Sequence, residues 1–436
     1  MVMNANPRCI PRGPQEKFKR GDDLLAWMGR HFNTYGDTYS ASLYGASAYV
    51  TRNAEFAYRT LVENWHNYVK GQYISRVALL LGKGLMVSKG DLWKRQRRMI
   101  QPGFNQDSVS MSMKLVASVN AKLLEKWQLA ARRNESVNVT HDVSAMVLEI
   151  VLRFIFGDDY DRVGGYFDVL SSEPARNVQF ATAFRALGKI IYEILQHRCS
   201  TGVVANDIFH LLMEARDPDT RCPMPDAQLI DEVLTLIVAG HETTASSLNW
   251  CWYLISQHPE VEQRLWAELA TLSDPLDALP FDDLAKFSYT RQILDETMRL
   301  YPAGWMVSRK ALQDDQLGDY FVPAGTEIYV AIYFIQRHPA LWNDPDRFDP
   351  GRLGPERSKD HHHLETLPFS AGPRNCIGAL FARSEMQIHL MTIARKLRLR
   401  YVESNPMELD AGVNLRSKFD FIMYPEEKNQ ALRRAG

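Results

Sequence analysis

Residues 369–378 constrain this chain more than any other stretch, and they read Phe-Ser-Ala-Gly-Pro-Arg-Asn-Cys-Ile-Gly. They place Cys376 in a loop of turn-forming residues, directly before a helical pattern that runs from about 379 to 397. A thiolate there would lie at a helix N-terminus, where free backbone N–H groups and the helix dipole stabilise negative charge. Gly372 and Gly378 would give the backbone freedom and leave room for a flat partner to approach closely.

Arg374, two residues before the cysteine, would pair with an acidic group on such a partner. A thiolate in this setting suits axial ligation of haem iron, because its electron donation favours cleavage of an O–O bond. The alternative is a buried small apolar residue, which is the usual fate of a lone cysteine. The stretch resembles the haem-binding signature Phe-x-x-Gly-x-Arg-x-Cys-x-Gly of the cytochrome P-450 superfamily. Its fixed positions match at Phe369, Gly372, Arg374, Cys376 and Gly378.

This resemblance implies a haem-thiolate monooxygenase whose cofactor is heme b (iron protoporphyrin IX), with Cys376 as the axial thiolate ligand of the metal. Such an enzyme would use O2 and two externally supplied electrons to hydroxylate or oxidise a hydrophobic small molecule. A terpenoid, a fatty acid and a polyketide-like compound all fit this description. We expect the electrons to come from a ferredoxin with its reductase, or from a flavodoxin, because no flavin or iron–sulfur domain fits in this length.

The composition is that of an ordinary globular protein, with 436 residues, 45% hydrophobic and 24% charged. Length alone would suggest two or three domains, but the motifs span the chain and must converge on one site. We therefore expect an irregular lead over residues 1–20 and a single haem-thiolate domain over residues 21–436. The net charge of −1 gives no reason to expect nucleic acid as a partner.

The cysteines indicate a reducing compartment. Their number is odd and no Cys-x-x-Cys pair occurs, so neither a disulfide framework nor a zinc or iron–sulfur site is indicated. No run of 18 apolar residues occurs, and the Pro- and Arg-containing N-terminus does not read as a signal peptide or membrane anchor. We therefore expect a cytoplasmic protein without a membrane anchor, similar to soluble bacterial-type members of the family.

Helical spacing dominates the chain, and three patches favour strands. The strand-rich patches are 38–49, 306–330 and 398–424. The helical patterns are 22–35, 54–65, 92–100, 109–132, 140–156, 175–197, 205–215, 226–257, 259–272, 282–300 and 379–397. The predicted fold class is mostly α with a smaller β portion (α+β), consistent with the single triangular fold that the resemblance implies.

Residues 226–256 predict one long helix, which ends near Pro259 and has Ala-Gly-His-Glu-Thr-Thr at its middle, over 239–244. The Thr243 hydroxyl can donate to the carbonyl of Ala239 and bend the helix. A purely structural role, in which Thr243 makes this bond at a helix kink, is therefore the alternative to a catalytic role. The hexapeptide resembles the family's central-helix motif (Ala/Gly)-Gly-x-(Asp/Glu)-Thr-(Thr/Ser). By that resemblance Thr243 is the catalytic alcohol and Glu242 the acid of a proton relay.

Glu296 and Arg299 are spaced i,i+3 on a predicted helix and can pair directly. Alone this is a weak signal, because surface ion pairs of that spacing are common. With Arg347 in the later Pro-Asp-Arg-Phe stretch, the residues resemble the family's Glu-Arg-Arg triad, whose role is structural. The triad would lock the loop that carries the thiolate.

Trp93 and Arg97 share one face of a helix and resemble the family's Trp-x-x-x-Arg, whose side chains contact haem propionates. Arg309 lies where several soluble members have another propionate-binding arginine. Lys94 and Arg98 share a neighbouring face, which would suit an acidic electron-donor protein. The alternative for this basic cluster is a solvated helix or a patch for another polyanion.

The resemblance points to a substrate pocket lined mostly by apolar side chains, which favours a hydrophobic substrate. Its candidates are also ordinary core residues by composition, so that alternative stays open. They include Leu236, Ala239, Trp305, Met306 and Phe419.

Two rival functions remain. A haem-thiolate peroxygenase would use hydrogen peroxide, but such members usually replace the acid and alcohol found here at Glu242 and Thr243. A non-catalytic haem-binding or sensing protein would keep Cys376 and would not need a proton relay.

Overall fold

The computed structural model describes residues 10, 12–14, 18, 23–75, 78–167, 178–272, 276, 279–354, 366–402 and 407–428. The irregular lead expected over residues 1–20 lies mostly outside them. The chain divides into two compact units, each assembled from segments far apart in the sequence. We call these the β-rich unit (Met1–Val77, Glu296–Cys376 and Leu409–Arg416) and the helical unit (Ala78–Asp295, Ile377–Glu408 and Ser417–Gly436). The expectation of a single catalytic domain over residues 21–436 stays a prediction.

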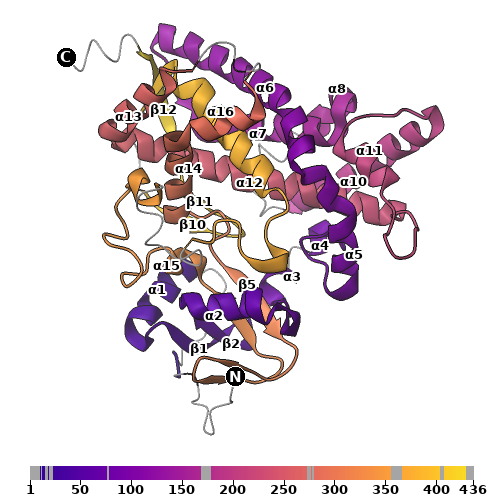
Figure 1. The fold of residues 1–436 in the computed structure, drawn as a ribbon, viewed down its shortest axis with the longest axis vertical. Coiled ribbons are helices and arrows are strands. Elements are labelled where there is room, and N and C mark those ends of the chain that lie inside the picture. Colours follow the sequence, from indigo (N-terminus) through magenta and orange to yellow (C-terminus); the bar gives the residue numbers. More distant parts are fainter. Residues whose placement is uncertain are drawn as a thin grey trace. The chain divides into compact units, whose positions relative to one another are not determined.

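The helical unit contains most of the long helices (Figure 1). Its helices are α4 (Ala78–Leu81), α5 (Gly90–Ile100), α6 (Gln106–Arg133), α7 (Val139–Phe156), α8 (Tyr160–Val163), α10 (Val178–Thr201), α11 (Ile208–Glu214), α12 (Asp226–Gln257), α13 (Pro259–Leu269), most of α14 (Ser288–Leu300) and α16 (Ala379–Ala394). The helical unit also contains the short helices η3 (Gln101–Phe104), η4 (Gly157–Asp159), η5 (Gly164–Phe167) and η7 (Phe281–Lys286), and the strands β4 (Val137–Asn138), β9 (Leu397–Tyr401) and β12 (Ile422–Glu427). The three strands form one sheet in the order β4-β12-β9.

Two of the long helices, α6 and α7, start where the sequence supplies a capping side chain. Asn105 accepts the backbone N–H of Ser108 at the start of α6, and Asn138 accepts that of His141 at the start of α7. Such caps satisfy N–H groups that have no partner inside the helix. Asn134 ends α6 with φ of 54°, a left-handed cap that asparagine tolerates better than most residues.

A buried polar chain joins α6, α12 and α16 within the helical core. The indole N–H of Trp252 donates to His389 Nε2 at 2.8 Å, and His389 Nδ1 lies 2.6 Å from Asn120 Oδ1. The Asn120 amide in turn donates to the carbonyl of Val116 at 2.8 Å. Burial lowers the pKa of His389 to about 3, so the ring stays neutral and donates through Nδ1. These bonds fix how the three helices are rotated against one another.

The β-rich unit contains α1 (Leu24–Tyr35), α2 (Ala54–Tyr58), η1 (Arg59–Glu63), α3 (Gln72–Ser75), α15 (Ile332–Ile335) and η10 (Gly372–Arg374). Its strands are β1 (Thr38–Leu43), β2 (Ala46–Thr51), β3 (Tyr68–Lys70), β5 (Val307–Ala311), β6 (Asp315–Leu317), β7 (Tyr320–Val322), β8 (Glu327–Val330), β10 (Leu409–Ala411) and most of β11 (Leu415–Ser417). A five-stranded sheet has the order β1-β2-β8-β5-β3, in which only β2 and β8 are parallel.

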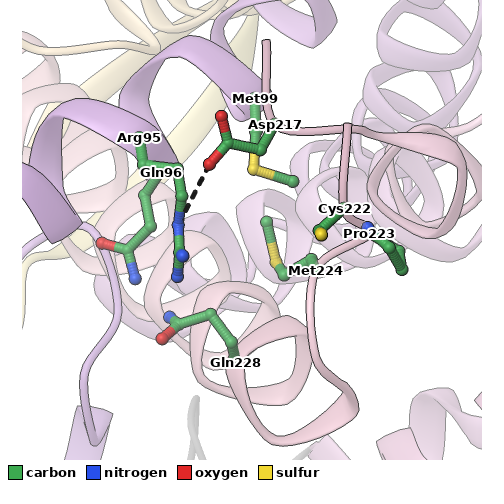
Figure 2. A pocket seen from close by; sticks show the side chains of 8 residues that line it. All are labelled: Arg95, Gln96, Met99, Asp217, Cys222, Pro223, Met224 and Gln228. Atoms are coloured by element: carbon green, nitrogen blue, oxygen red, sulfur yellow. Dashed lines mark ion pairs between the residues drawn. The ribbon is translucent and has the colours of Figure 1, made fainter. Parts of the chain in front are cut away.

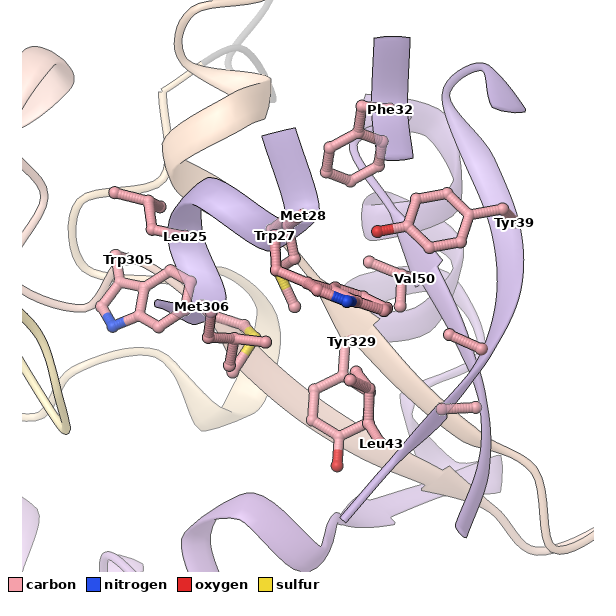
Figure 3. Close-up of a cluster of buried hydrophobic side chains, with 14 of the residues drawn as sticks. Leu25, Trp27, Met28, Phe32, Tyr39, Leu43, Val50, Trp305, Met306 and Tyr329 are labelled. Carbon is pink, nitrogen blue, oxygen red and sulfur yellow. The ribbon is translucent and has the colours of Figure 1, made fainter. Parts of the chain in front are cut away.

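One hydrophobic cluster of the β-rich unit packs α1 against the sheet (Figure 3). Trp305 and Met306, which the sequence placed in the substrate pocket, lie in it with 1% and 5% of their surface exposed. The Trp305 indole N–H donates to the carbonyl of Gly412 at 3.0 Å. Their assignment to the substrate pocket stays a prediction, although both side chains are packed in this cluster.

The fold class is confirmed, and so are most of the long helices. The pattern over 226–256 is the single helix α12, and those over 109–132 and 140–156 are α6 and α7. Helix boundaries moved by several residues, for instance at α10 and at the start of α14, because fraying and capping set helix ends more than hydrophobic spacing does. Within the described part of the chain, no helix is long and apolar enough to cross a membrane.

Candidate active site

The loop before Cys376 is closed by its own backbone and leaves the thiol exposed. The Cys376 N–H donates to the carbonyl of Phe369 at 2.9 Å. Ser370 and Gly372 have φ of 59° and 72°, and a Cβ on Gly372 would lie 2.0 Å from the carbonyl oxygen of Leu61 in η1. Only glycine fits this close approach. Cys376 is exposed and forms no disulfide within the described part of the chain, and it stands three residues before the start of α16, as the sequence predicted.

The β-rich unit also contains a buried ion pair. Glu296 and Arg299 have no exposed side-chain surface, and they pair through two bonds of 2.7 and 2.9 Å. The other Arg299 N–H groups donate to the carbonyls of Gln336, Pro345 and Arg347. All five guanidinium N–H groups therefore have an acceptor, which satisfies the buried cation.

The third member of this cluster is Arg352 and not Arg347. Arg352 Nε donates to Glu296 Oε1 at 3.2 Å, and its other nitrogens donate to nearby backbone carbonyls. The side chain of Arg347 is exposed, and this residue contributes only its carbonyl oxygen. The expectation for Arg347 was wrong because two arginines stand five residues apart, and only burial distinguishes them.

Gln336 connects this cluster to the cysteine loop. Its side-chain amide donates to the carbonyls of Met298 and Arg299 at 3.0 and 2.9 Å. Its carbonyl oxygen accepts the backbone N–H of Leu367 at 2.7 Å, two residues before Phe369. No sequence motif singled out Gln336, yet it is the direct link between the end of α14 and the segment that leads to Cys376.

Arg309 on β5 is a buried cation suited to an anionic ligand. It is 7% exposed, and its Nη1 donates to the carbonyl of Ser308 at 3.0 Å. Burial and the nearby charge of Arg374 lower its pKa to about 10. No carboxylate of the described residues lies within ion-pair distance of it. Because an uncompensated buried charge is costly, the carboxylate of a haem propionate fits this position.

The central helix α12 packs closely against α7 at the predicted motif (Figure 1). The Thr243 hydroxyl donates to the carbonyl of Ala239 at 2.7 Å, as the sequence predicted. The next turn repeats the pattern, since Ser247 Oγ donates to the Thr243 carbonyl at 2.9 Å. A Cβ on Gly240 would lie 3.2 Å from Val151 of α7, which explains why glycine occupies this helical position.

His241 anchors the same turn to α7. It is 3% exposed, and its Nε2 lies 2.9 Å from the hydroxyl oxygen and 3.1 Å from the carbonyl oxygen of Ser144. Burial lowers the pKa of His241 to about 4, so the imidazole is neutral at physiological pH. This contact fixes which sides of α12 present Glu242 and Thr243, which are both half-buried.

Helix α5 carries Trp93 and Arg97 one turn apart in the helical unit. Trp93 is 5% exposed, whereas Arg97 is half-buried and its Nε donates to Gln101 Oε1 at 3.1 Å. The basic neighbours have acidic partners, since Lys94 pairs with Asp91 at 3.2 Å and Arg98 with Asp219. The basic cluster is therefore exposed but partly neutralised.

Figure 2 shows a small pocket beside α5. Residues of α5 and of the segment before α12 line it. Arg95 and Asp217 form an ion pair of 3.9 Å there, next to Gln96, Cys222 and Met224. The cavity measures about 20 Å³, enough for one water molecule and too small for an organic substrate.

The predicted site residues fall in both units. Cys376, Phe369, Arg374 and Arg309 belong to the β-rich unit, where they lie on the cysteine loop and β5. The helical unit contains Thr243, Glu242, Trp93, Arg97 and Gly378. It also contains three pocket candidates, of which Leu236 is buried and Ala239 and Phe419 are half-buried.

Arg352→Ala should lower the free energy of unfolding by about 3 kcal/mol, because it leaves part of the buried Glu296 carboxylate without a partner. Arg347→Ala is the matched control and should change that free energy by less than about 0.5 kcal/mol, since its side chain is exposed. Denaturant unfolding of the two variants measures the difference. Equal destabilisation by both substitutions would contradict the assignment of Arg352.

His241 should make the protein sensitive to acid. Its pKa is about 4 in the folded chain against 6.5 when unfolded, so its contribution is complete above pH 6.5 and is lost as the pH falls towards 4. The loss amounts to about 3 kcal/mol. His241→Gln should show a correspondingly smaller drop in unfolding free energy between pH 6.5 and 4. Parallel curves for variant and wild type would remove His241 as the cause.

Comparison with known proteins agrees with this geometry. A sequence model of the family described as Cytochrome P450 matches residues 12–168 and 167–422. Cyclooctat-9-en-7-ol 5-monooxygenase of Streptomyces melanosporofaciens is 31% identical over 406 residues, 88% of this chain and 86% of that protein. The chloroplastic protein LUTEIN DEFICIENT 5 of Arabidopsis thaliana is 26% identical over 424 residues, 88% of this chain and 71% of that protein.

The crystal structure of the cytochrome P450DA heme domain has the same fold, with a TM-score of 0.85 at 23% identity. The match covers 97% of this chain and 98% of that one. The family match extends over nearly the whole chain and includes both the cysteine loop and the central helix. This chain therefore belongs to the cytochrome P450 family, and it is a haem-thiolate monooxygenase.

Proposed function

We propose that this enzyme hydroxylates or oxidises a hydrophobic small molecule, and that Cys376 is the axial thiolate ligand of its haem. The observation that carries the proposal is the Cys376 loop, which is closed by the bond to Phe369 and presents an exposed thiol before α16. An exposed thiol on a loop closed by its own backbone suits an axial iron ligand, because such a ligand must keep one orientation.

Four further side chains would hold the haem carboxylates and edge. Arg309 supplies the buried cation described above, and Arg374 lies close enough to lower its pKa. Trp93 and Arg97 would contribute from α5, where they share one face. When bound, haem supplies the activation of oxygen and the oxidation of a C–H bond, and the protein supplies ligation, orientation and protons.

Thr243 and Glu242 are the proposed proton-handling pair. The Thr243 hydroxyl donates to Ala239, which leaves its oxygen lone pairs available as acceptors. Rotation about its Cα–Cβ bond would release the O–H from that carbonyl to donate elsewhere. Glu242 precedes it and is half-buried, so its carboxyl can exchange a proton with a neighbouring group. The anchor between His241 and Ser144 would keep both side chains in register.

A hydrophobic substrate is supported by relatives and by the pocket candidates. The Streptomyces relative is named for cyclooctat-9-en-7-ol, an unsaturated alcohol, and a mouse relative is named for leukotriene B4. Leu236, Ala239 and Phe419 remain proposed pocket residues, and Leu236 and Ala239 stand one turn apart on α12 near Thr243. A terpenoid, a fatty acid or a polyketide-like compound all satisfy this chemistry.

The proposed electron donor is an acidic protein, either a ferredoxin served by its reductase or a flavodoxin. Lys94 and Arg98 are about half-exposed on α5 and would meet such a partner. Their internal partners Asp91 and Asp219 weaken the field, so we expect modest affinity and strong salt dependence. A cytoplasmic location is proposed as well. The support for it is that none of the four described cysteines forms a disulfide; they are Cys199, Cys222, Cys251 and Cys376.

The acid–alcohol pair favours a monooxygenase over a peroxygenase, because a peroxide-using enzyme needs no proton delivery from that pair. Thr243→Ala should preserve haem binding and the thiolate spectrum and should lower the fraction of consumed electrons recovered in product, with peroxide released instead. Thr243→Ser restores the hydroxyl and should recover most of the coupling. Product, peroxide and reductant consumption are measured together. Unchanged coupling in Thr243→Ala would remove Thr243 from the proton relay.

A further inference from the structure

Gln336 follows the last residue of α15, and its side chain has no exposed surface. A primary amide carries two N–H donors and one oxygen acceptor without a net charge. The Nε2 group donates to the carbonyls of Met298 and Arg299, and Oε1 accepts the N–H of Leu367. A buried amide that is bonded at both ends cannot turn without breaking all of these bonds, so its orientation is fixed.

The donor end of this amide caps α14. The last carbonyls of a helix have no partner inside it, and Met298 and Arg299 directly precede Leu300, where α14 ends. Arg337, the next residue after Gln336, donates to the carbonyl of Leu300. Two consecutive side chains therefore satisfy the end of α14 from outside the helix.

The acceptor end of the amide holds Leu367. The N–H of this residue is bound to Gln336 at 2.7 Å, and its carbonyl accepts the N–H of Ser370 at 3.0 Å. Its side chain is 3% exposed and packs in the same hydrophobic cluster as Ile332 and Ile335 of α15. Leu367 is therefore held through both of its backbone groups and through its side chain.

Two backbone bonds connect this fixed residue to the cysteine. The bond from Ser370 closes a turn onto Leu367, and Phe369 lies inside that turn. The carbonyl of Phe369 accepts the N–H of Cys376 at 2.9 Å. A displacement of Leu367 would therefore move the carbonyl to which the cysteine backbone is bound. Partners outside the ligand set commonly fix the orientation of a metal ligand in this way.

We infer that Gln336 is a positioning residue for the thiolate. Its amide fixes Leu367 against the end of α14, and the turn at Ser370 passes that position on to the Cys376 backbone. Gln336 can have this role only if Cys376 is the haem ligand proposed above. The alternative is a purely structural role, in which the amide only satisfies the last carbonyls of α14.

Gln336→Met keeps the length of the side chain and removes its donors and its acceptor. In the haem-loaded protein, reduced and exposed to carbon monoxide, it should lower the ratio of the thiolate Soret band to the shorter-wavelength band of a neutral cysteine by about tenfold. Hydrogen exchange of the Leu367 amide should become about tenfold faster, because that N–H loses its acceptor. An unchanged band ratio would overturn the inference. A wild type without the thiolate band would instead refute the proposed ligation by Cys376.

Gln387→Met is the matched control. Gln387 on α16 is also buried, and its Nε2 donates to the carbonyls of Leu284 and Phe287 at 2.8 and 3.1 Å. Neither bond reaches the segment before Cys376. The control should lower the free energy of unfolding about as much as Gln336→Met does and should keep the band ratio of the wild type. Equal loss of the thiolate band in both variants would overturn the inference, because lost stability would then be the cause.

Gln336→Glu separates the two ends of the amide and supplies the test if Gln336→Met fails to fold. A carboxyl group accepts hydrogen bonds whether or not it is protonated, so Leu367 keeps its partner while α14 loses at least one donor. The variant should therefore keep the thiolate band and the slow exchange of the Leu367 amide, although its free energy of unfolding falls. Loss of the thiolate band in the folded variant would overturn the inference.

Discussion

The structure depends most on one buried carboxylate, that of Glu296, and on the two arginines that surround it. Arg299 uses all five of its N–H groups, and Arg352 adds a second cation. A buried charge is tolerable only when it is this completely paired. The two arginines bind the backbone carbonyls of Gln336 and of the segment 343–347, and the Gln336 side chain extends the cluster to Leu367. The segment that leads to the cysteine loop is therefore held in one position. A metal ligand needs such a fixed orientation.

The helical unit holds the proposed proton-handling residues Glu242 and Thr243 inside one continuous helix, α12. Gly240 lets α7 approach, and His241 binds Ser144 on that helix. Thr243 and Ser247 donate to carbonyls one turn back, so polar groups are satisfied without breaking α12. A neutral histidine is suited to this anchor, because a charged one would be costly at that depth.

Much of this was predictable because the relevant signals are local in the sequence. A few adjacent residues are enough to predict three features of the structure. These are the turn-forming glycines around Cys376, the hydrogen bond from Thr243 to Ala239, and the long helix α12. Arg352, Gln336 and the aromatic core around Trp305 were missed, since their roles depend on burial and on partners tens of residues away.

The most direct test of the central claim is the absorption spectrum of the reduced, carbon monoxide-bound protein in single-cysteine variants. Cys376→Ser should lose the long-wavelength Soret band that a thiolate ligand produces, because serine cannot supply that thiolate. Cys222→Ser and Cys199→Ser remove other exposed thiols and should keep the band. A Cys376→Ser protein that retains the thiolate spectrum would contradict the account, because the iron would then have another ligand.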